Sequence, residues 1–414
     1  MNRRDFLKSA LFAAALAPVV RAAAQTGLDD KANAQNADAN VKDGVPQVTR
    51  RRCKNTDATL PLLGFGLMRL PEKDGKIDEA TAQAMVDAAM KAGCNYFDTA
   101  YMYHSGESER FARKALSKYP RDAYFLTSKM PTIMLKRPED MERIFQKQLD
   151  RTGAGYFDFY LMHWLNVDHW KIAKSLDLYG FMKKKQAEGK IRRIGFSYHG
   201  EPETLQEIAA AHPWDIAQIQ LNYLDWDLCR SREQYEILTK LGIPVIVMEP
   251  LKGGSLVKLT PEAQKVFRDA EPDASVASWG LRYAASLPNV QVVLSGMSDP
   301  SQMEDNLKTF SPLRPLADAE RKIIADAVAA YRKSGAVPCT ACRYCMPCPV
   351  GVDIPRNLAI LNQTKAGGKQ FYAKLIYDAM PEDERASACV ECGACLKKCP
   401  QKIEIPKHLK ELAG

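Results

Sequence analysis

Eight of the eleven cysteines lie close together near the C-terminus, in two runs of four. Each run begins with three cysteines separated by two residues, and each ends in a Cys-Pro pair. Three thiolates at this spacing can bind one face of a 4Fe-4S cube, and the cysteine before proline typically supplies the fourth ligand of the other cluster. The sequence therefore predicts two 4Fe-4S clusters, one held by Cys339, Cys342, Cys345 and Cys399, and the other by Cys389, Cys392, Cys395 and Cys348.

Two zinc knuckles or a disulfide knot are the alternative interpretations of these cysteines. Zinc sites usually consist of two C-x-x-C pairs and do not need a third evenly spaced cysteine followed by Cys-Pro. Disulfides are disfavoured because C-x-x-C repeats pair poorly with themselves. The first run has two residues before Cys348, whereas the common bacterial spacing has three. Cys348 is therefore the ligand that the motif supports least.

A second set of reactive residues follows apolar runs in the central part of the chain. Asp98 and Tyr103 lie at and after one run, Lys129 closes the next, and His163 closes the one after that. Reduction of a carbonyl by hydride places negative charge on its oxygen, which then needs a proton donor and hydrogen-bond donors. Tyr103 would supply the proton, because a nearby cation makes a phenol proton exchangeable at neutral pH. Lys129 would be this cation, held by Asp98, and His163 would orient the carbonyl.

Each of these four residues also has an ordinary structural interpretation. An Asp-Thr pair at a strand end is often a helix cap, a tyrosine on a loop is commonly a packing residue, and a lysine at a rim is usually solvated. His163 taken alone would more often be a rim histidine than a catalyst. The catalytic interpretation depends on the four residues occurring together at consecutive strand ends.

The elements that must position these residues are eight short apolar runs that alternate with amphipathic stretches. Such runs are typical of strands and such stretches of helices. Eight strands alternating with helices predict an α/β fold, a (β/α)8 TIM barrel, whose active site gathers at the carboxyl ends of the strands. The expected strands cover residues 62–67, 96–100, 124–129, 157–163, 191–197, 216–221, 245–248 and 290–294.

The C-terminal part of the chain predicts a second, smaller domain. Residues 317–333 have the pattern of a charged amphipathic helix, and the stretch between the two cysteine runs also has a helical pattern. We expect a barrel over residues 47–316, a connecting helix over 317–336, and a small, mainly α-helical ferredoxin-type domain over 337–414.

The N-terminus, residues 1–24, resembles a bacterial twin-arginine signal. Arg3 and Arg4 precede an apolar stretch that ends in three alanines. This stretch is about half of the ~20 residues that span a bilayer, so we expect no transmembrane segment after signal removal. Such signals export folded proteins, which lets clusters be inserted before the oxidising periplasm is reached, so we expect a periplasmic location. Residues 25–46 lack apolar periodicity and are expected to be a flexible linker.

The central region, roughly residues 48–312, resembles the aldo/keto reductase family. The segments FDTAYMY, TSK and LMHW contain Asp98, Tyr103, Lys129 and His163, which match the Asp-Tyr-Lys-His tetrad of that family in order. The resemblance implies interconversion of a small-molecule carbonyl and alcohol by hydride transfer with NADP or NAD. The residues that match its nucleotide contacts are Met68, Ser197, Gln218, Met248, Leu251, Gly253, Gly254, Ser255, Gly296, Met297, Asp305 and Asn306.

The choice between NAD and NADP stays open at this point. Gly296 and Gln302 stand where NADPH-specific members carry the Lys and Arg that bind the 2′-phosphate. A phosphate dianion without a cation partner loses charge-assisted hydrogen bonds. Met248 and Tyr198 likewise replace a tyrosine and an asparagine that are common in the family. The sequence is therefore compatible with either nucleotide.

Two functions are compatible with this organisation. In the first, the barrel is an oxidoreductase whose hydride transfer is coupled to two 4Fe-4S clusters that exchange single electrons with a redox partner protein. In the second, an electron-transfer ferredoxin is fused to a non-catalytic barrel that senses a cofactor or docks a partner. The formal net charge of +8 is mild for 414 residues, and no basic block with interleaved aromatic residues indicates nucleic acid binding.

Overall fold

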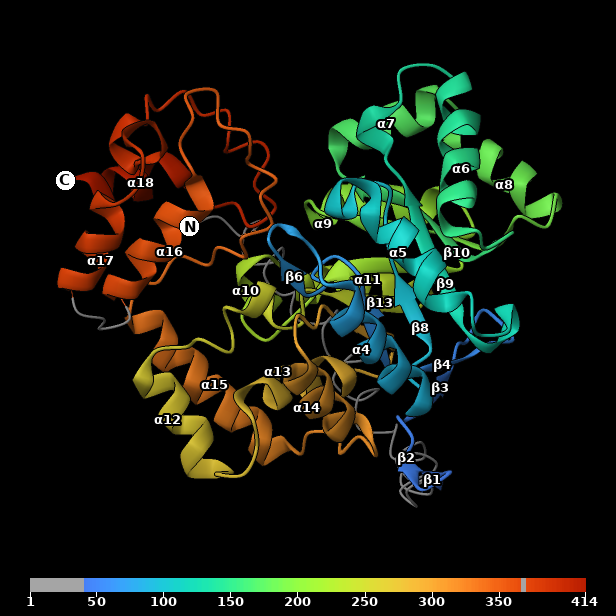
Figure 1. Cartoon of the computed structure of the whole chain (residues 1–414), viewed down its shortest axis with the longest axis horizontal. Coiled ribbons are helices and arrows are strands. Elements are labelled where there is room, and N and C mark those ends of the chain that lie inside the picture. The colour runs from blue at the N-terminus through green and yellow to red at the C-terminus, as the bar shows by residue number, and fades with distance from the viewer. Residues whose placement is uncertain (1–40, 366–369) are drawn as a thin grey trace, which may run out of the picture.

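The computed structural model describes residues 41–365 and 370–414 of the chain. Its centre is a closed barrel of eight parallel strands (Figure 1), which confirms the predicted α/β barrel. The expected signal and the first part of the expected linker lie outside the described residues. In their order around the barrel, the strands are β10 (Phe157–Leu165), β11 (Ile191–Tyr198), β12 (Ile216–Gln220), β13 (Val245–Met248), β14 (Val290–Ser295), β5 (Leu63–Gly66), β8 (Tyr96–Asp98) and β9 (Phe125–Met130).

Helices follow most of the strands and return the chain to the start of the next one, as parallel neighbours require. Several of them begin at a side chain that accepts a backbone N–H of the first turn, namely Asn166, Thr260, Ser275 and Asp299. The helices of this layer are α4 (Glu79–Lys91), α5 (Glu107–Leu116), α6 (Glu139–Thr152), α7 (Val167–Ser175), α8 (Leu178–Ala187), α9 (Pro202–Ala211), α10 (Asp225–Leu228), α11 (Ser231–Lys240), α12 (Pro261–Ala270), α13 (Val276–Ala285) and α14 (Pro300–Phe310).

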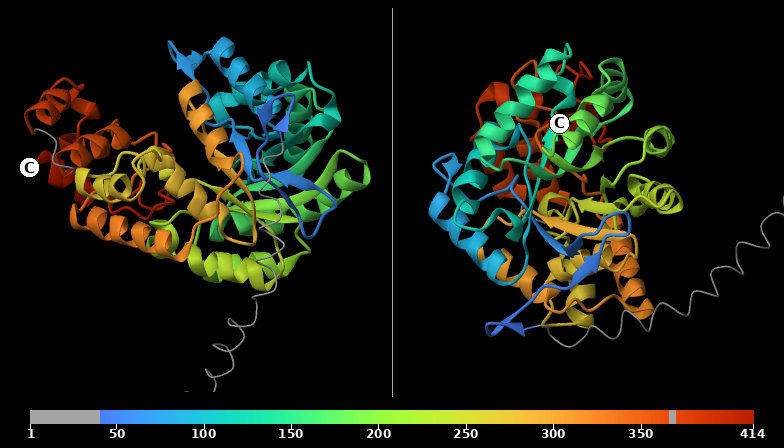
Figure 2. Two further views of the ribbon diagram at one scale, coloured as in Figure 1. Left: turned by 90° about the horizontal axis from the view of Figure 1, so that it is seen from below. Right: turned by 90° about the vertical axis from the view of Figure 1, so that its right-hand side faces the viewer.

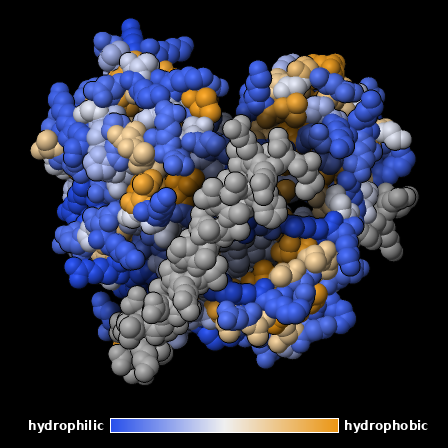
Figure 3. Space-filling view, turned by 180° about the vertical axis from the view of Figure 1, so that it is seen from behind, coloured by the Kyte–Doolittle hydropathy of each residue, from blue (hydrophilic) through white to orange (hydrophobic). Residues whose placement is uncertain are grey.

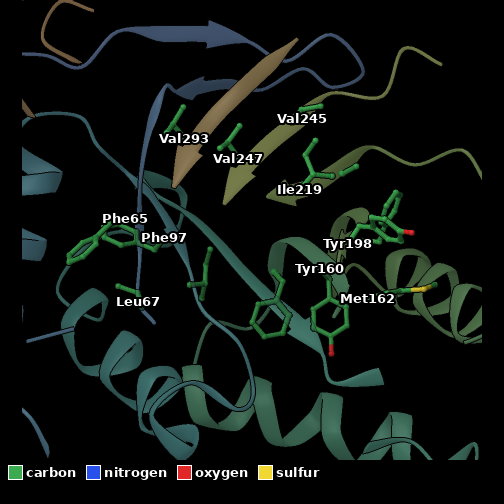
Figure 4. Close-up of a cluster of buried hydrophobic side chains, with 14 of the residues drawn as sticks. Phe65, Leu67, Phe97, Tyr160, Met162, Tyr198, Ile219, Val245, Val247 and Val293 are labelled. Carbon is green, nitrogen blue, oxygen red and sulfur yellow. The ribbon is translucent and has the colours of Figure 1, made fainter. Parts of the chain in front are cut away.

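Alternation along the barrel strands divides their buried apolar residues between two clusters. Figure 4 shows part of the larger cluster, in which strand residues such as Phe65, Phe97 and Val247 pack toward the helix layer. The smaller cluster fills the barrel interior with residues of the opposite parity, including Tyr96, Phe159, Leu161, Ile216, Ile246, Val292 and Leu294. Because successive strand residues point to opposite faces, a residue two positions beyond an interior one also faces the interior. This rule directs Asp98, His163 and Gln218 toward the barrel axis at the carboxyl ends of their strands.

The amino-terminal end of the barrel is closed by a hairpin of β3 (Arg50–Arg52) and β4 (Thr59–Pro61). Cys53 and Leu60 of this hairpin are fully buried and join the interior cluster. A shorter hairpin, β1 (Val41–Lys42) and β2 (Val45–Pro46), lies in the segment expected to be flexible linker. Its turn residues Asp43 and Gly44 both have positive φ, as the type I′ turns favoured by an Asp-Gly pair require. The sequence carried this signal in the segment VKDGVP.

The helix α15 (Asp318–Lys333) connects the barrel to the C-terminal region and packs against α12 through Ile324, Ala327 and Tyr331. We call residues 337–414 the cluster module. Its regular elements in the described residues are helical, namely α16 (Ile354–Lys365), α17 (Gln370–Asp378), α18 (Ile405–Ala413) and short 3-10 turns, in agreement with the predicted ferredoxin-type domain. The module lies to one side of the barrel (Figures 1 and 2).

The surface is largely hydrophilic on the face in Figure 3, where apolar side chains gather in small separate patches. Two exposed apolar residues of the cluster module, Val390 and Leu396, are 64% and 44% exposed. Within residues 41–365 and 370–414, no helix has both the length and the apolar character that a membrane span needs.

Candidate active site and cluster sites

A cavity of about 730 Å³ lies at the carboxyl ends of the barrel strands. Asp98 enters it from the end of β8, Lys129 from β9 and His163 from β10. Tyr103 enters from the 3-10 turn η1 (Tyr103–Gly106), which follows β8. The structure therefore brings the four predicted catalytic residues to one wall, although they come from four separate segments of the chain.

The four side chains are held together by a buried ion pair and by ring contacts. Lys129 Nζ lies 2.5 Å from Asp98 Oδ1, donates to the Thr99 carbonyl oxygen at 2.9 Å, and lies 3.4 Å from the Tyr103 hydroxyl oxygen. The rings of Tyr103 and His163 meet edge to face with centroids 5.9 Å apart. This geometry places a phenol, an ammonium group and an imidazole around one point of the cavity.

Lys129 is fixed from behind by a second buried network. Gln148 of α6 donates to the Lys129 carbonyl oxygen at 3.1 Å and to Glu109 Oε1 at 2.7 Å. Glu109 also accepts from Ser128 at 2.8 Å and pairs with Arg151 at 3.2 Å. Because Glu109 is fully buried, its charge needs these partners. The network orients β9, and with it the ammonium group of Lys129.

Burial controls the protonation of the tetrad. It raises the pKa of the Tyr103 phenol well above its usual value, and the nearby Asp98 and Glu249 charges add to this rise. The sequence had suggested the opposite direction, with Lys129 making the phenol more acidic. Burial also lowers the pKa of His163 well below its usual value, and the Lys129 charge strengthens this effect. At neutral pH the structure thus presents a protonated phenol and a neutral imidazole.

The Asp98 and Lys129 pair is subject to two opposing effects. Burial raises the pKa of Asp98 and lowers the pKa of Lys129. Each charge opposes the shift of the other, because the two groups lie 2.5 Å apart. Removing either partner would leave the other buried without its counter-ion, which is the costly state for such pairs.

The same cavity is lined by all but two of the predicted nucleotide-binding residues. Of the two exceptions, Ser255 donates to the Lys252 carbonyl oxygen at 2.8 Å, and Met297 is fully buried in the core. The residues that do line the cavity are Met68, Ser197, Gln218, Met248, Leu251, Gly253, Gly254, Gly296, Asp305 and Asn306.

The cavity is compatible with a dinucleotide in size and chemistry. The side-chain oxygen Oε1 of Gln218 is buried and has no hydrogen-bond partner within the described part of the chain, so it can accept from a carboxamide. Gly253 and Gly254 follow β13 with φ values of +65° and +93°. Because glycine has no side chain, the backbone at these two positions can approach a group such as a diphosphate closely. These residues would hold the nucleotide along the cavity wall.

The eight C-terminal cysteines line two smaller cavities. One is bordered by Cys339, Cys342, Cys345 and Cys399, and the other by Cys348, Cys389, Cys392 and Cys395, with Cys345 at the edge of both. Ala341, Arg343 and Glu391, which lie between these cysteines, have positive φ, so the chain curls around each cavity. Four thiols are the donor set of a 4Fe-4S cluster. Apart from the shared Cys345, which makes a fifth thiol at the second cavity, this grouping is compatible with the crossed arrangement predicted from the spacing.

The cluster module also forms part of the large cavity, which sequence reasoning missed. Cys342 and Tyr344 line it together with the tetrad. Arg69, His199 and Glu249 are further lining residues that were not predicted. Arg69 and Glu249 directly follow the predicted residues Met68 and Met248, and this adjacency was the available signal. Nothing in the sequence indicated the contribution of the module, because it depends on how the two parts pack.

Comparison with known proteins agrees with this architecture. The profile of the aldo/keto reductase family matches residues 62–329, and that of the 4Fe-4S dicluster domain matches residues 338–404. An aldo-keto reductase of Mycolicibacterium vanbaalenii is 31% identical over 62% of this chain and 85% of its own length. The NADH-specific methylglyoxal reductase of Escherichia coli is 26% identical over 64% of this chain and 94% of its own length.

Solved structures share the fold of the barrel. The holo form of an aldo-keto reductase from Bacillus halodurans has a TM-score of 0.57 at 24% identity, covering 68% of this chain and 96% of that one. An aldo-keto reductase from Klebsiella pneumoniae in complex with NADPH has a TM-score of 0.55 at 21% identity, covering 69% and 95%. Since the family profile covers more than half of the sequence, this chain belongs to the aldo/keto reductase family and carries a 4Fe-4S dicluster domain in addition.

Proposed function

We propose that this protein interconverts a small carbonyl compound and its alcohol, and that the two clusters link this reaction to a redox partner protein. The observation that carries the proposal is the shared cavity. Cys342 and Tyr344 of the cluster module line the same cavity as Tyr103 and His163 of the barrel. A cluster held by Cys342 would therefore lie beside the site of carbonyl chemistry.

The tetrad has the properties that carbonyl reduction needs. Tyr103 stays protonated at neutral pH because burial raises its pKa, so it can donate a proton to the oxygen that becomes negative. Lys129, 3.4 Å from the Tyr103 hydroxyl oxygen, stabilises the charge that this donation leaves on the phenol. His163 is a neutral imidazole and can hydrogen-bond the carbonyl oxygen without competing for the Tyr103 proton.

Carbonyl reduction consumes two electrons and two hydrogens, one delivered to carbon and one to oxygen. When bound, a nicotinamide cofactor would supply the hydride and with it both electrons. The two clusters, at one electron each, would return two electrons to the oxidised nicotinamide, which takes up one proton. Either nucleotide is compatible with the cavity. The names of similar proteins include both choices, since one is an NADH-specific reductase and another was solved with NADPH.

The two cysteine groups differ in exposure. This difference supports an electron route that runs between the large cavity and the protein surface. The group containing Cys342 borders the large cavity. The group containing Cys392 is the outer one, because Cys392 is exposed and the neighbouring Val390 and Leu396 are 64% and 44% exposed. A partner protein would contact this apolar rim, and electrons would pass between it and the cavity through both clusters.

The predicted twin-arginine signal supports a periplasmic location for this activity. A protein exported in the folded state can carry oxygen-sensitive or thiol-bound groups that were assembled before export. Immunoblotting of cell fractions checks the location, and exchange of Arg3 and Arg4 for lysine should leave the protein in the cytoplasm. Unchanged export of that variant would contradict the signal assignment.

The coupling is tested by stopped-flow absorbance on anaerobically prepared protein with both clusters present. In protein freed of any bound nucleotide beforehand, mixing with NADH or NADPH should bleach the cluster absorbance, and an added carbonyl from a panel of aldehydes and ketones should reverse the bleaching. Tyr103→Phe should keep the bleaching and lose the reversal. Clusters that never respond on the timescale of turnover would contradict the coupling. A wild type that passes electrons yet reduces no carbonyl would instead favour an electron-transfer protein with a docking barrel.

A further inference from the structure

The barrel and the cluster module are joined by a buried polar network beside the nucleotide loop. Its centre is Lys252, which is fully buried and lies 2.5 Å from the equally buried Asp225. Lys252 also donates to the side-chain oxygen of Gln401, in the cluster module. Although Lys252 precedes Gly253 and Gly254 in the loop that lines the large cavity, its own side chain points away from that cavity and toward the module.

Gln401 uses its whole amide group in this network. Its oxygen accepts from Lys252 and from Gln220 Nε2 at 2.8 Å, and its nitrogen donates to Gln220 Oε1 at 2.8 Å and to Glu249 Oε2 at 3.1 Å. A primary amide has two donor hydrogens and two acceptor lone pairs, so every site is occupied. Because Gln401 is only 4% exposed, displacing it would leave several polar groups buried without partners.

The module also contacts the nucleotide loop at Gly253. A Cβ atom at this position would lie 2.3 Å from the Thr340 carbonyl oxygen, so only glycine allows the approach. Arg69 donates to the same carbonyl oxygen at 2.9 Å. The loop is thus fixed on both sides, by Thr340 at Gly253 and by Gln401 at Lys252 and Glu249.

From these contacts we infer that the cluster module locks the nucleotide loop, so that a bound nucleotide remains in the protein as a resident group between turnovers. In this role Gln401 is a positioning residue, since it holds the loop without lining the cavity. The inference rests on the proposed function only in that the loop binds a nucleotide. Opening the loop requires separation of Gln401 from Lys252 and Glu249, and this slow step would limit exchange.

A resident nucleotide would account for carbonyl chemistry away from a soluble nicotinamide pool. The nucleotide would enter before or during folding of the module and would be recycled in place, while the partner protein exchanges electrons at the outer cluster. The loop would then retain the nucleotide through many turnovers and would not release it after each one.

The experiment measures nucleotide release from the full-length protein with both clusters present. Radiolabelled NAD and NADP serve as probes, because the oxidised forms give no electrons to the clusters, and release is followed as loss of protein-bound label after mixing with excess unlabelled nucleotide. In the wild type we expect release to be at least tenfold slower than turnover with a carbonyl. Gln401→Ala should accelerate release at least tenfold, while Lys407→Ala is the control. Lys407 lies in α18 of the same module and pairs with Glu404, three residues away in that module, at the surface, so its loss should leave the release rate unchanged.

Gln220→Ala removes the same amide pair from the barrel side and lies outside the cluster motif. It should also accelerate release. Iron content and cluster absorbance are measured on both variants to check that the clusters are still bound. Release in the wild type that is faster than turnover would overturn the inference. The same conclusion would follow if both variants released nucleotide at the wild-type rate. Wild-type protein that yields no nucleotide on denaturation and also binds neither NAD nor NADP would overturn the proposed function, and this inference with it.

Discussion

Tyr344 stacks on Trp164, with ring centroids 4.2 Å apart and planes inclined by 29°. Tyr344 lies between the cysteines Cys342 and Cys345 of the cluster module, and Trp164 directly follows His163 of the tetrad. Tyr344 also meets the edge of the His199 ring at 6.0 Å. The cluster module therefore supplies an aromatic wall to the candidate active site.

Replacing Tyr344 tests whether this wall determines substrate binding. Tyr344→Phe keeps the stacked ring and should stay within about twofold of the wild type. Tyr344→Leu removes an aromatic face that a substrate ring could contact, a contact worth about 0.5–1.5 kcal/mol, and should raise KM for a ring-bearing aldehyde such as benzaldehyde about 2- to 10-fold. Steady-state kinetics with benzaldehyde and acetaldehyde measures the effect. Equal losses in both variants would show that the hydroxyl, and not the ring, is the important group.

Lys129→Met should lower both kcat and the free energy of unfolding. The substitution removes the cation next to Tyr103 and leaves Asp98 buried without its partner. Loss of one member of a buried pair costs about 3–5 kcal/mol, and loss of effective proton transfer lowers kcat about 10²- to 10⁴-fold. Urea unfolding and kcat measure the two effects. The double variant Asp98→Asn with Lys129→Met should recover stability but not activity, and recovery of activity would contradict the proposed role of Lys129.

The pH profile should reflect the buried tetrad. Because burial keeps Tyr103 protonated and His163 neutral, these two residues should leave kcat/KM for carbonyl reduction unchanged between about pH 6.5 and 9. A change near pH 7 should come from Glu249 of the same cavity, because burial raises the pKa of its carboxyl group to about 7. The folded pKa of His163 lies below its unfolded value of about 6.5, so the unfolded state binds more protons just below that pH. Stability from His163 is therefore present above pH 6.5 and is lost as the pH falls.

This loss has an upper limit of about 1.4 kcal/mol per pH unit, the value for a single proton. His163→Gln keeps a neutral hydrogen-bonding side chain and should remove this contribution. Unfolding free energies of both proteins between pH 7.5 and 5 check the difference in slope. Identical slopes would show that His163 titrates equally in the folded and unfolded states.

Gly253→Ala and Gly254→Ala form a matched pair for the contact between the module and the loop. Both glycines have positive φ, which is strained for alanine. A Cβ atom on Gly253 would collide with the Thr340 carbonyl oxygen, whereas one on Gly254 would meet nothing within 4 Å. Gly253→Ala should therefore lower the thermal midpoint more than Gly254→Ala, and should expose the module to proteolysis. Equal behaviour of the two variants would contradict the close approach of Thr340.

The eight barrel strands and the tetrad could be predicted because both depend on local pattern. Strand residues alternate between the helix layer and the interior, so Asp98, two positions after Tyr96, faces the interior as soon as the strand forms. The same holds for His163 after Leu161. The polar composition of residues 25–46 predicted a flexible linker, whereas residues 41–46 form a hairpin. The Asp43-Gly44 pair favours the turn of this hairpin regardless of the polar residues around it.

The position of the cluster module could not be predicted in this way. The side chain of Lys252 belongs to a segment that matches a nucleotide loop, yet it points to Gln401, which lies far away in the sequence. No sequence pattern indicates that the module residues Thr340, Tyr344 and Gln401 contact the barrel. Thr340 makes its contact through a backbone carbonyl oxygen, Tyr344 through one ring face and Gln401 through its side-chain amide.

The sequence by itself determined the barrel and predicted the cluster ligands and the order of the candidate catalytic residues, since cysteine spacing and side-chain alternation act over a few residues of chain. Only the tertiary structure decided that Cys342 and Tyr344 of the cluster module line the same cavity as the tetrad. That outcome depends on complementary shape and on the complete pairing of buried polar groups between segments remote in sequence, which no local pattern encodes.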